Sequence, residues 1–423
     1  MNTKLIFEEF SLPNKLHCVL HKNTNHPLVN VTLGYKVGAK DEDAGQFGVA
    51  HLFEHLMFEG SKNIPKSQHQ KIVMDCGGRT NAFTMQDATV YYEDVPANFL
   101  ETALWLESDR MNEINLSEEN LENQKKVVLE EKLQRYDNAP YGTFLSLASK
   151  NIFQGSLYEH TTIGEADHIR NFSRQDAMNF HHKYYSPANA ELLITGDIDI
   201  EHTKKLVEKY FGDINKANGI IRRENKFKEL TEDVNITIED NVMLERFYIS
   251  FSIPKTGSDE DYILEYFTKL VFNNKSSRLY KLLVYDKMLL KNISSFKYSI
   301  QDGGFYMIIG TLNPGNSSEE AQKIILDEIR SFAEGDIADY DMEKIKNELE
   351  FSHVNKLISL NKISTATVFN RMYFNDVNRI NDELSRYNAV TKEALKNTIR
   401  KYFVDAKRVT LNYVPKKIAN NQK

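Results

Sequence analysis

Residues 173–194 read SRQDAMNFHHKYYSPANAELLI, and residues 391–412, which lie 218 positions later, read TKEALKNTIRKYFVDAKRVTLN. In each stretch a Ser or Thr suited to an N-cap opens a helix, an aromatic pair closes it, and a strand pattern follows at the same distance. Residues 29–35 (VNVTLGY) and 247–253 (FYISFSI) alternate in a similar way, again 218 positions apart. The shared offset predicts a duplicated domain.

The repeat divides the chain into two α+β halves. Each half begins with strands, continues with helices and ends with another strand, which predicts a mixed or antiparallel β-sheet packed with helices rather than an alternating βαβ array. We place the N-terminal domain at residues 1–215, a polar, charge-rich linker region at 216–232, and the homologous C-terminal domain at 233–423. A chain of 423 residues is also too long for one ordinary hydrophobic core.

Local patterns add detail within the first half. Residues 7–20 predict a hairpin, and residues 81–84 and 88–92 predict the two strands of another hairpin with a turn at residues 85–87. Helical spacing runs over residues 97–109 and 117–136, and Ser117 is suited to cap the second of these helices.

Composition argues against several classes of function. The net charge is −7 and no basic stripe stands out, which argues against a nucleic-acid-binding surface. No run of about 18 apolar residues is present that could cross a bilayer. Cys18 and Cys76 are the only cysteines, too few for a disulfide framework or a Cys-rich metal site, and we expect reduced thiols. The N-terminus lacks an apolar secretion segment, which favours the cytoplasm, although a periplasmic protein that has lost its signal peptide would look the same.

The stretch His51-Leu52-Phe53-Glu54-His55 predicts a metal site. On a helix, residues i and i+4 lie one above the other, so His51 and His55 project from one face and can hold one metal ion. Glu54 lies nearly one turn beyond His51, where its carboxylate can reach a metal-bound water without binding the metal. The order H-x-x-E-H inverts H-E-x-x-H and is a signature of zinc peptidases. The alternative is a pair of structural histidines on a core or surface helix.

Peptide hydrolysis makes further demands on such a site. A catalytic zinc needs three protein ligands and an open position, so one more ligand must come from elsewhere in the chain. The reaction also needs a base that takes a proton from the attacking water and returns it to the leaving amine. Glu54 is suited to that role.

The segment resembles the inverted-motif zinc metallopeptidases of the pitrilysin and insulinase group, which includes the mitochondrial processing peptidases. In size the chain is similar to the bacterial subunits that resemble the processing peptidases. The likeness covers nearly the whole chain, because residues 55–61 (HLMFEGS), 77–84 (GGRTNAFT), 184–190 (YYSPANA) and 196–197 (GD) look like successive segments of the family. The resemblance implies two homologous α+β domains, Zn2+ as the cofactor and hydrolysis of peptide bonds.

The resemblance also implies the third ligand. In the family it is a glutamate on a later helix, often within a V-x-x-E-E sequence. Residues 127–131 (VVLEE) match this pattern and place Glu131, 76 residues after His55, as the ligand, with Glu130 as the alternative.

Substrate binding follows from the same resemblance. In the family an edge strand of the catalytic domain pairs with an extended peptide, which gives affinity through main-chain hydrogen bonds without demanding one sequence. Asn81, Ala82, Phe83 and Thr84 match that strand, and Asn81 and Ala82 would lie nearest the scissile bond. The alternative for Asn81 is a strand residue that only flanks a turn.

Two departures from the family pattern stand out. Many members carry an acid seven residues before the third ligand, and here that position is Gln124, so we expect a hydrogen bond there rather than a charge. Members also bring an Arg and, seven residues on, a Tyr from a C-terminal-type domain to grip substrate and stabilise the oxyanion. The matching positions here are Val284 and Lys291, and neither can do this. Arg278 and Tyr280 lie close by, in a segment common to both kinds of half, and we expect them to be structural.

We therefore hypothesise a zinc-dependent endopeptidase that acts on peptides or unfolded protein segments. No second H-x-x-E-H occurs after residue 215, so the metal site belongs to the first half only. A related second chain would supply the Arg and Tyr and close a clam-like chamber of four domains, and a homodimer would also close it. The alternatives are a non-catalytic assembly subunit and metal binding without hydrolysis. Retention of His51, His55, Glu131 and Glu54 together favours catalysis.

Overall fold

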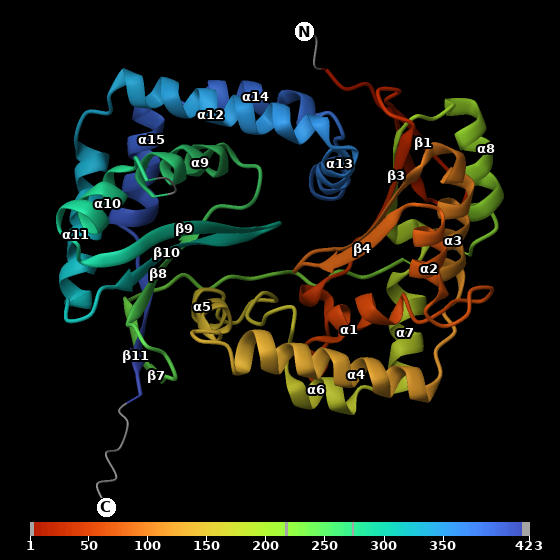
Figure 1. Ribbon diagram of the computed structural model, residues 1–423, viewed down its shortest axis with the longest axis horizontal. Coiled ribbons are helices and arrows are strands. Elements are labelled where there is room, and N and C mark those ends of the chain that lie inside the picture. The colour runs from red at the N-terminus through yellow and green to blue at the C-terminus, as the bar shows by residue number, and fades with distance from the viewer. Residues whose placement is uncertain (1–3, 216–218, 273–274, 417–423) are drawn as a thin grey trace, which may run out of the picture. The chain divides into compact units, whose positions relative to one another are not determined.

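A computed structural model of the protein describes residues 4–215, 219–272 and 275–416 (Figure 1). The chain forms two compact units. The first unit is drawn from residues 1–132, 160–224 and 353–383, and the second from residues 133–159, 225–352 and 384–423. The predicted linker region begins with three residues outside the described part of the chain, and its remainder, residues 219–232, contains no helix or strand.

A six-stranded sheet in the order β1-β2-β6-β3-β5-β4 forms the centre of the first unit. Only the β2–β6 pair is parallel. The two predicted hairpins are present, as β1–β2 and as β4–β5. The strands are β1 (Glu8–Ser11), β2 (His17–Lys22), β3 (Leu28–Tyr35), β4 (Arg79–Thr84), β5 (Thr89–Pro96) and β6 (Ala190–Gly196).

The second unit repeats this plan with five strands, in the order β7-β11-β8-β10-β9. Again one pair, β7–β11, is parallel and the others are antiparallel. Its strands are β7 (Val234–Asp240), β8 (Arg246–Ile253), β9 (Leu290–Ile300), β10 (Gly303–Leu312) and β11 (Arg408–Pro415). Apart from β1, the strand order matches that of the first sheet, which confirms the prediction of two α+β domains with mixed sheets.

The matching sequence stretches form matching elements. Helix α7 (Arg174–Tyr184) begins after Ser173, whose hydroxyl accepts a hydrogen bond from the N–H of Asp176. Helix α15 (Lys392–Ile399) begins after Thr391, whose hydroxyl accepts from the N–H of Ala394. Strands β6 and β11, which follow these helices, also begin 218 positions apart. The N-cap residues therefore set the start of the equivalent helix in each half, as predicted.

A helix from the opposite half of the sequence packs on each sheet. Helix α13 (Leu360–Phe374) packs on β3 and β6, and helix α5 (Phe144–Ile152) packs on β8 and β11. At Gly34 of β3 an added Cβ atom would lie 2.5 Å from the side chain of Val368 in α13, so this close approach requires glycine. The ring of Phe144 in α5 stacks on Tyr248 of β8 with 4.7 Å between centroids. Each compact unit is therefore built from segments that are not continuous in sequence. The domain ranges 1–215 and 233–423 follow the sequence repeat and stay a prediction.

Helix α3 (Leu100–Asn112) covers the first sheet on the side opposite α13 (Figure 1). It corresponds to the helix predicted over 97–109, with one 3-10 turn at Ala97–Phe99 before it. The helix predicted over 117–136 is α4 (Glu118–Lys132) followed by a π-helical turn at Leu133–Asp137, and the Ser117 hydroxyl accepts from the N–H of Asn120 at 3.1 Å. The first unit also contains α1 (Val49–Leu56), α2 (Gln68–Asp75), α6 (Ala166–Asn171) and α8 (Ile200–Phe211).

Helices α9 (Asp259–Val271), α11 (Ser318–Glu334) and α15 pack with the second sheet into an apolar core that includes Phe251, Phe267, Ile325 and Leu395. A short helix α10 (Arg278–Tyr280) continues into a π-helical segment, η5 (Lys281–Asp286), and a further π-helical segment at Arg400–Val404 follows α15. Helices α12 (Asp339–Ile358) and α14 (Arg379–Asn388) each contain residues of both units.

None of the helices among the described residues combines the length and apolar content needed to span a membrane.

Candidate metal centre

Helix α1 carries the H-x-x-E-H segment on its more accessible face. The side chains of His51, Glu54 and His55 are 16, 14 and 23% exposed. The remaining apolar positions of the helix are buried in the first unit, namely Val49, Ala50, Leu52, Phe53 and Leu56. Burial of this apolar stripe fixes the rotation of the helix and presents the three polar side chains together.

The N-terminus of α1 is held by a buried carboxylate. Glu42 accepts hydrogen bonds from the backbone N–H groups of Gly48 at 2.9 Å and Ala50 at 2.7 Å, and the Nε2 atom of His160 lies 2.9 Å from the same carboxylate. Gly48 has a φ of 100°, and an added Cβ would lie 2.7 Å from the carbonyl of Ile163, so this turn needs glycine. Sequence reasoning missed Glu42 and His160, because an acid seven residues before a helix has no recognisable signature.

Three potential metal ligands converge beside α1. Nε2 of His51 lies 3.4 Å from Oε2 of Glu131 in α4, and Nε2 of His55 lies 3.7 Å from the same oxygen. All three residues have a donor atom within 4.8 Å of the others. The structure therefore brings together His51, His55 and Glu131, whereas the neighbouring Glu130 is exposed.

This donor set fits a zinc ion. Donors that bind one tetrahedral zinc at about 2.0 to 2.1 Å lie roughly 3.3 Å apart, close to the distances found here. Two imidazoles and one carboxylate also form one of the known ligand sets of catalytic zinc, and such a set leaves one position for water or substrate. His51, His55 and Glu131 would hold the ion.

Glu54 lies beside His51 and is not among the three converging ligands. Its Oε2 lies 3.8 Å from Nδ1 of His51 and accepts a 2.6 Å hydrogen bond from the Thr84 hydroxyl. Burial raises the pKa of the Glu54 carboxyl above its ordinary value, while the Thr84 hydrogen bond and the nearby His51 act in the opposite direction. A carboxylate with a raised pKa is a stronger base toward water than an exposed glutamate.

The strand that carries Thr84, β4, lies at the edge of the first sheet. Phe83 contacts Phe369 of α13, whereas Thr84 points to Glu54 of α1, as expected from alternation along a strand. The N–H of Met85 donates to the carbonyl of Ala88 across the β4–β5 turn. In an antiparallel ladder the bonding pairs alternate, so the N–H and C=O of Ala82 point away from β5, toward the free edge. Asn81 is exposed on this strand.

The positions that depart from the family pattern have other partners. Gln124 donates a 2.8 Å hydrogen bond to Glu59. In the second unit, Val284 packs against the apolar core and Lys291 is exposed on β9. Arg278 pairs with Glu328 at 2.8 Å and lies over the ring of Phe332. Tyr280 packs against the core of this unit.

A second cluster of potential ligands lies in the core of the first unit, formed by His69, Glu93 and Glu107. Nε2 of His69 lies 2.6 Å from Glu93, and Nε of Arg110 donates to Glu107 at 2.9 Å. Burial lowers the pKa of His69 to about 3 and raises the pKa of Glu93 to about 8. Arg110 and Glu107 also form an ion pair within the cluster. These buried groups pair with one another, and together with Arg110 they form a polar network in the core.

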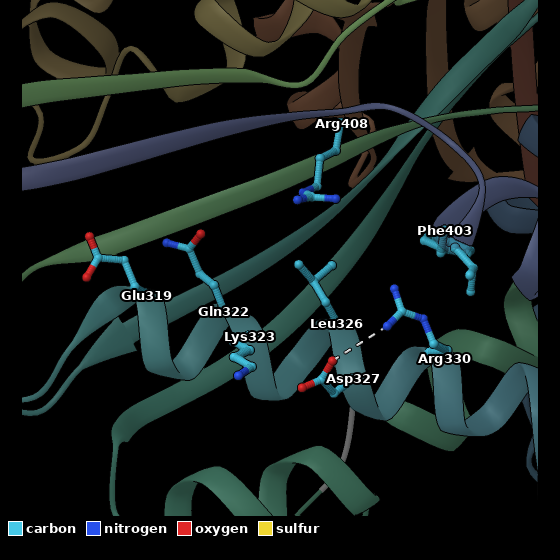
Figure 2. A pocket seen from close by; sticks show the side chains of 9 residues that line it. Glu319, Gln322, Lys323, Leu326, Asp327, Arg330, Phe403 and Arg408 are labelled. Carbon is cyan, nitrogen blue, oxygen red and sulfur yellow. Dashed lines mark ion pairs between the residues drawn. The ribbon is translucent and has the colours of Figure 1, made fainter.

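A cavity of about 320 Å³ lies in the second unit, and Figure 2 shows the side chains that line it. Asp327 and Arg330 face each other across one side of it at 3.9 Å, and Arg408 pairs with Asp233 at 3.0 Å. The lining contains no histidine or cysteine, so it lacks the donors that converge beside α1. It consists of Glu319, Gln322, Lys323, Leu326, Asp327, Arg330, Phe403, Val404 and Arg408.

Two helix-borne histidines, a glutamate from a second helix and a carboxylate beside them define a metallopeptidase type of centre. Residues 17–165 match the family model described as Insulinase (Peptidase family M16), and residues 171–349 match the one described as Peptidase M16 inactive domain. The chain belongs to this insulinase-like M16 family of zinc metalloproteases, with its N- and C-terminal domains.

Similar proteins carry names of the same kind. The chain is 28% identical over 414 residues to the zinc protease PqqE of Helicobacter pylori, which covers 96% of this chain and 93% of the relative. It is 23% identical over 403 residues to the uncharacterized zinc protease YmxG of Bacillus subtilis, which covers 95 and 96%. The crystal structure of a protease from Helicobacter pylori matches with a TM-score of 0.91 at 27% identity, over 97% of this chain and 100% of that one. The periplasmic protease PqqL of Escherichia coli shares the fold, with a TM-score of 0.79 at 17% identity, over 97% of this chain and 47% of that one.

Proposed function

We propose that the chain is a zinc-dependent endopeptidase that hydrolyses peptides or unfolded protein segments. The observation that carries this proposal is the convergence of His51, His55 and Glu131 with the Glu54 carboxylate beside them. Zinc bound there supplies a Lewis acid and lowers the pKa of its water. Glu54 takes the proton from the attacking water and passes it to the leaving amine.

The free edge of β4 is suited to hold the substrate. An extended peptide that adds to this edge would form main-chain hydrogen bonds with Ala82, two residues before the strand ends beside Glu54. Asn81 and Phe83 lie on the same strand and would border the peptide. Main-chain pairing supplies affinity for many sequences, which is appropriate for an enzyme that acts on unfolded chains.

We also propose that a second, paralogous chain completes the substrate-binding site. Two positions support this part of the proposal. The family resemblance implies an Arg and a Tyr there, but this chain has a half-buried Val284 and an exposed Lys291. A homodimer would also close the chamber. The cytoplasmic location stays a prediction.

The Glu54→Gln variant tests the catalytic part of the proposal. We expect wild type and variant to bind one zinc per chain, and cleavage of a quenched-fluorescence peptide to fall by about 10²- to 10⁴-fold because the base is lost. Zinc content and melting temperature are the controls. Unchanged cleavage by Glu54→Gln would refute the mechanism.

The partner is tested by assaying the chain with and without any related chain encoded beside its gene. We expect cleavage to rise when the two are mixed. Full activity of the purified chain as a monomer would exclude the second subunit and leave the zinc mechanism intact.

A further inference from the structure

Thr84 makes a contact that its place in a substrate-binding strand does not explain. It is the last residue of β4, and its hydroxyl donates a 2.6 Å hydrogen bond to Oε2 of Glu54 on α1. The other polar side chain close to this oxygen is His51, whose Nδ1 lies 3.8 Å away, beyond hydrogen-bonding distance. Thr84 therefore holds the carboxylate from the strand side of the site.

We propose that Thr84 is a positioning residue for the general base. Through this residue the orientation of the Glu54 carboxylate depends on the strand on which the peptide binds. The inference rests on the proposed function and adds a role to it. Thr84 is not one of the three converging ligands. It acts through Glu54.

The need for positioning follows from the flexibility of glutamate. A Glu side chain has three rotatable bonds, so holding it in one conformation costs conformational entropy. Threonine is suited to this task because its branched Cβ restricts χ1, so its hydroxyl has a defined place relative to the strand. The Thr84 hydroxyl engages Oε2, and the backbone N–H of Thr84 also interacts with the Glu54 carboxylate, so the end of β4 orients this side chain through two groups.

The position of Thr84 on the strand links this contact to substrate binding. Residues 82 and 84 have the same orientation in the ladder, so the main-chain groups of both point away from β5, and the N–H of Thr84 also interacts with the Glu54 carboxylate. A peptide bound to Ala82 would extend the sheet and stiffen the strand that ends in Thr84. The orientation of the base thus depends on the same element that places the scissile bond.

The test compares Thr84→Val, which keeps the shape and removes the hydroxyl, with Thr84→Ser, which keeps the hydroxyl. We expect Thr84→Val to lower kcat by about 10- to 100-fold, the usual effect of losing a partner that orients a catalytic group, with KM changed by less than about twofold. Thr84→Ser should restore kcat to within about threefold of wild type, since the hydrogen bond can form again. A crystal structure of Thr84→Val should show the Glu54 carboxylate moved from its wild-type position.

Thr89→Val is the matched control. Thr89 lies directly opposite Thr84 in the β4–β5 ladder, and its hydroxyl donates to the carbonyl of Val37 at 2.9 Å. This variant makes the same chemical change in the same hairpin, so it should lose some stability and keep the wild-type kcat. A loss of kcat in Thr84→Val alone would then come from the contact with Glu54.

Several outcomes overturn the proposal. A Thr84→Val variant with wild-type kcat, tested beside an inactive Glu54→Gln, excludes the role of Thr84 and leaves the proposed function standing. Equal losses in Thr84→Val and Thr84→Ser, or loss of zinc from Thr84→Val, also contradict a role through the hydroxyl. Zinc-loaded wild type that cleaves no peptide, with or without the second chain, refutes the proposed function itself.

Discussion

Apart from the extra strand β1, the two units of this protein have the same strand order, but they differ in their chemistry. All twelve histidines of the chain fall within the residue ranges of the first unit, and the second unit has none. Helix α9 follows β8 as α1 follows β3, yet α9 places Leu264, Phe267 and Val271 in an apolar core. The duplicated scaffold therefore does not require a metal centre. The fold supports the site, and specific side chains in one copy create it.

The first unit also buries charges that help to define its interior. Arg110 is fully buried, pairs with Glu107 and lies over the ring of Tyr91 at 4.4 Å. Removing one partner of such a pair is costly because it leaves a buried charge uncompensated. This network lies in the same unit as the proposed active site. The free energy of unfolding, and its dependence on pH, therefore report on buried charges of the first unit.

The largest expected effect concerns the ligands. Replacing His51 or His55 by Ala, or Glu131 by Gln, should lower zinc affinity by more than about 100-fold, since loss of an outer-sphere partner alone costs about 10- to 100-fold. Zinc content by elemental analysis and peptide cleavage measure the change. Glu130→Gln is the control, because this exposed neighbour should keep both zinc and activity. If Glu130→Gln loses zinc and Glu131→Gln keeps it, the assignment of the third ligand is wrong.

Next in size is the buried ion pair. Arg110→Met should lower the free energy of unfolding by about 3 to 5 kcal/mol, because Glu107 would keep a buried charge without its partner. Urea unfolding at neutral pH measures the loss. In the double variant Arg110→Met/Glu107→Met most of the stability should return, because both charges are then gone. A single variant that loses less than about 1 kcal/mol would show that the network contributes little.

A smaller effect is expected in the pH dependence of stability. Burial raises the pKa of Glu93 to about 8 in the folded protein, whereas the unfolded chain releases this proton near the ordinary value of about 4.5. Between these values the folded state holds the extra proton, so this contribution to stability is complete at low pH and is lost as pH rises through about 8.

Glu93→Gln removes this contribution, because its side chain cannot ionise. Unfolding free energies of wild type and variant, compared at pH values on both sides of the raised pKa, isolate the part that belongs to Glu93. The stability of wild type should fall more steeply between pH 6 and 9 than that of Glu93→Gln. Parallel curves would mean that Glu93 is already ionised at neutral pH in the folded protein.

The smallest effect should be equal in the two units. Ser173→Ala and Thr391→Ala each remove an N-cap from the equivalent helices α7 and α15, and each should cost about 1 kcal/mol. Chemical denaturation of both variants, with the wild-type zinc content as a control, measures this. If Ser173→Ala lowers the free energy of unfolding and Thr391→Ala does not, the second copy of the repeat has kept the N-cap residue but not its contribution to stability.

Local signals explain why much of the fold could be predicted from the sequence. The repeated caps, the alternating strands and the two hairpins depend on neighbours within about one turn of helix or one strand, and they appear as expected. The exchange of α5 and α13 between the halves could not be predicted in this way. It depends on the fit of α13 against Gly34 and of Phe144 against Tyr248, contacts between residues far apart in the chain.

The sequence by itself determined that His51 and His55 lie on one helical face with Glu54 beside them, because the spacing of i and i+4 is a local property of the α-helix. The sequence also predicted Glu131 as the third ligand, through its match to a family pattern. Only the tertiary structure decided what holds these groups in place. Glu42 anchors the start of α1 and Thr84 holds the base, and both contacts arise from segments that folding brings together. The strand expected to bind substrate thus also holds the carboxylate expected to act on it.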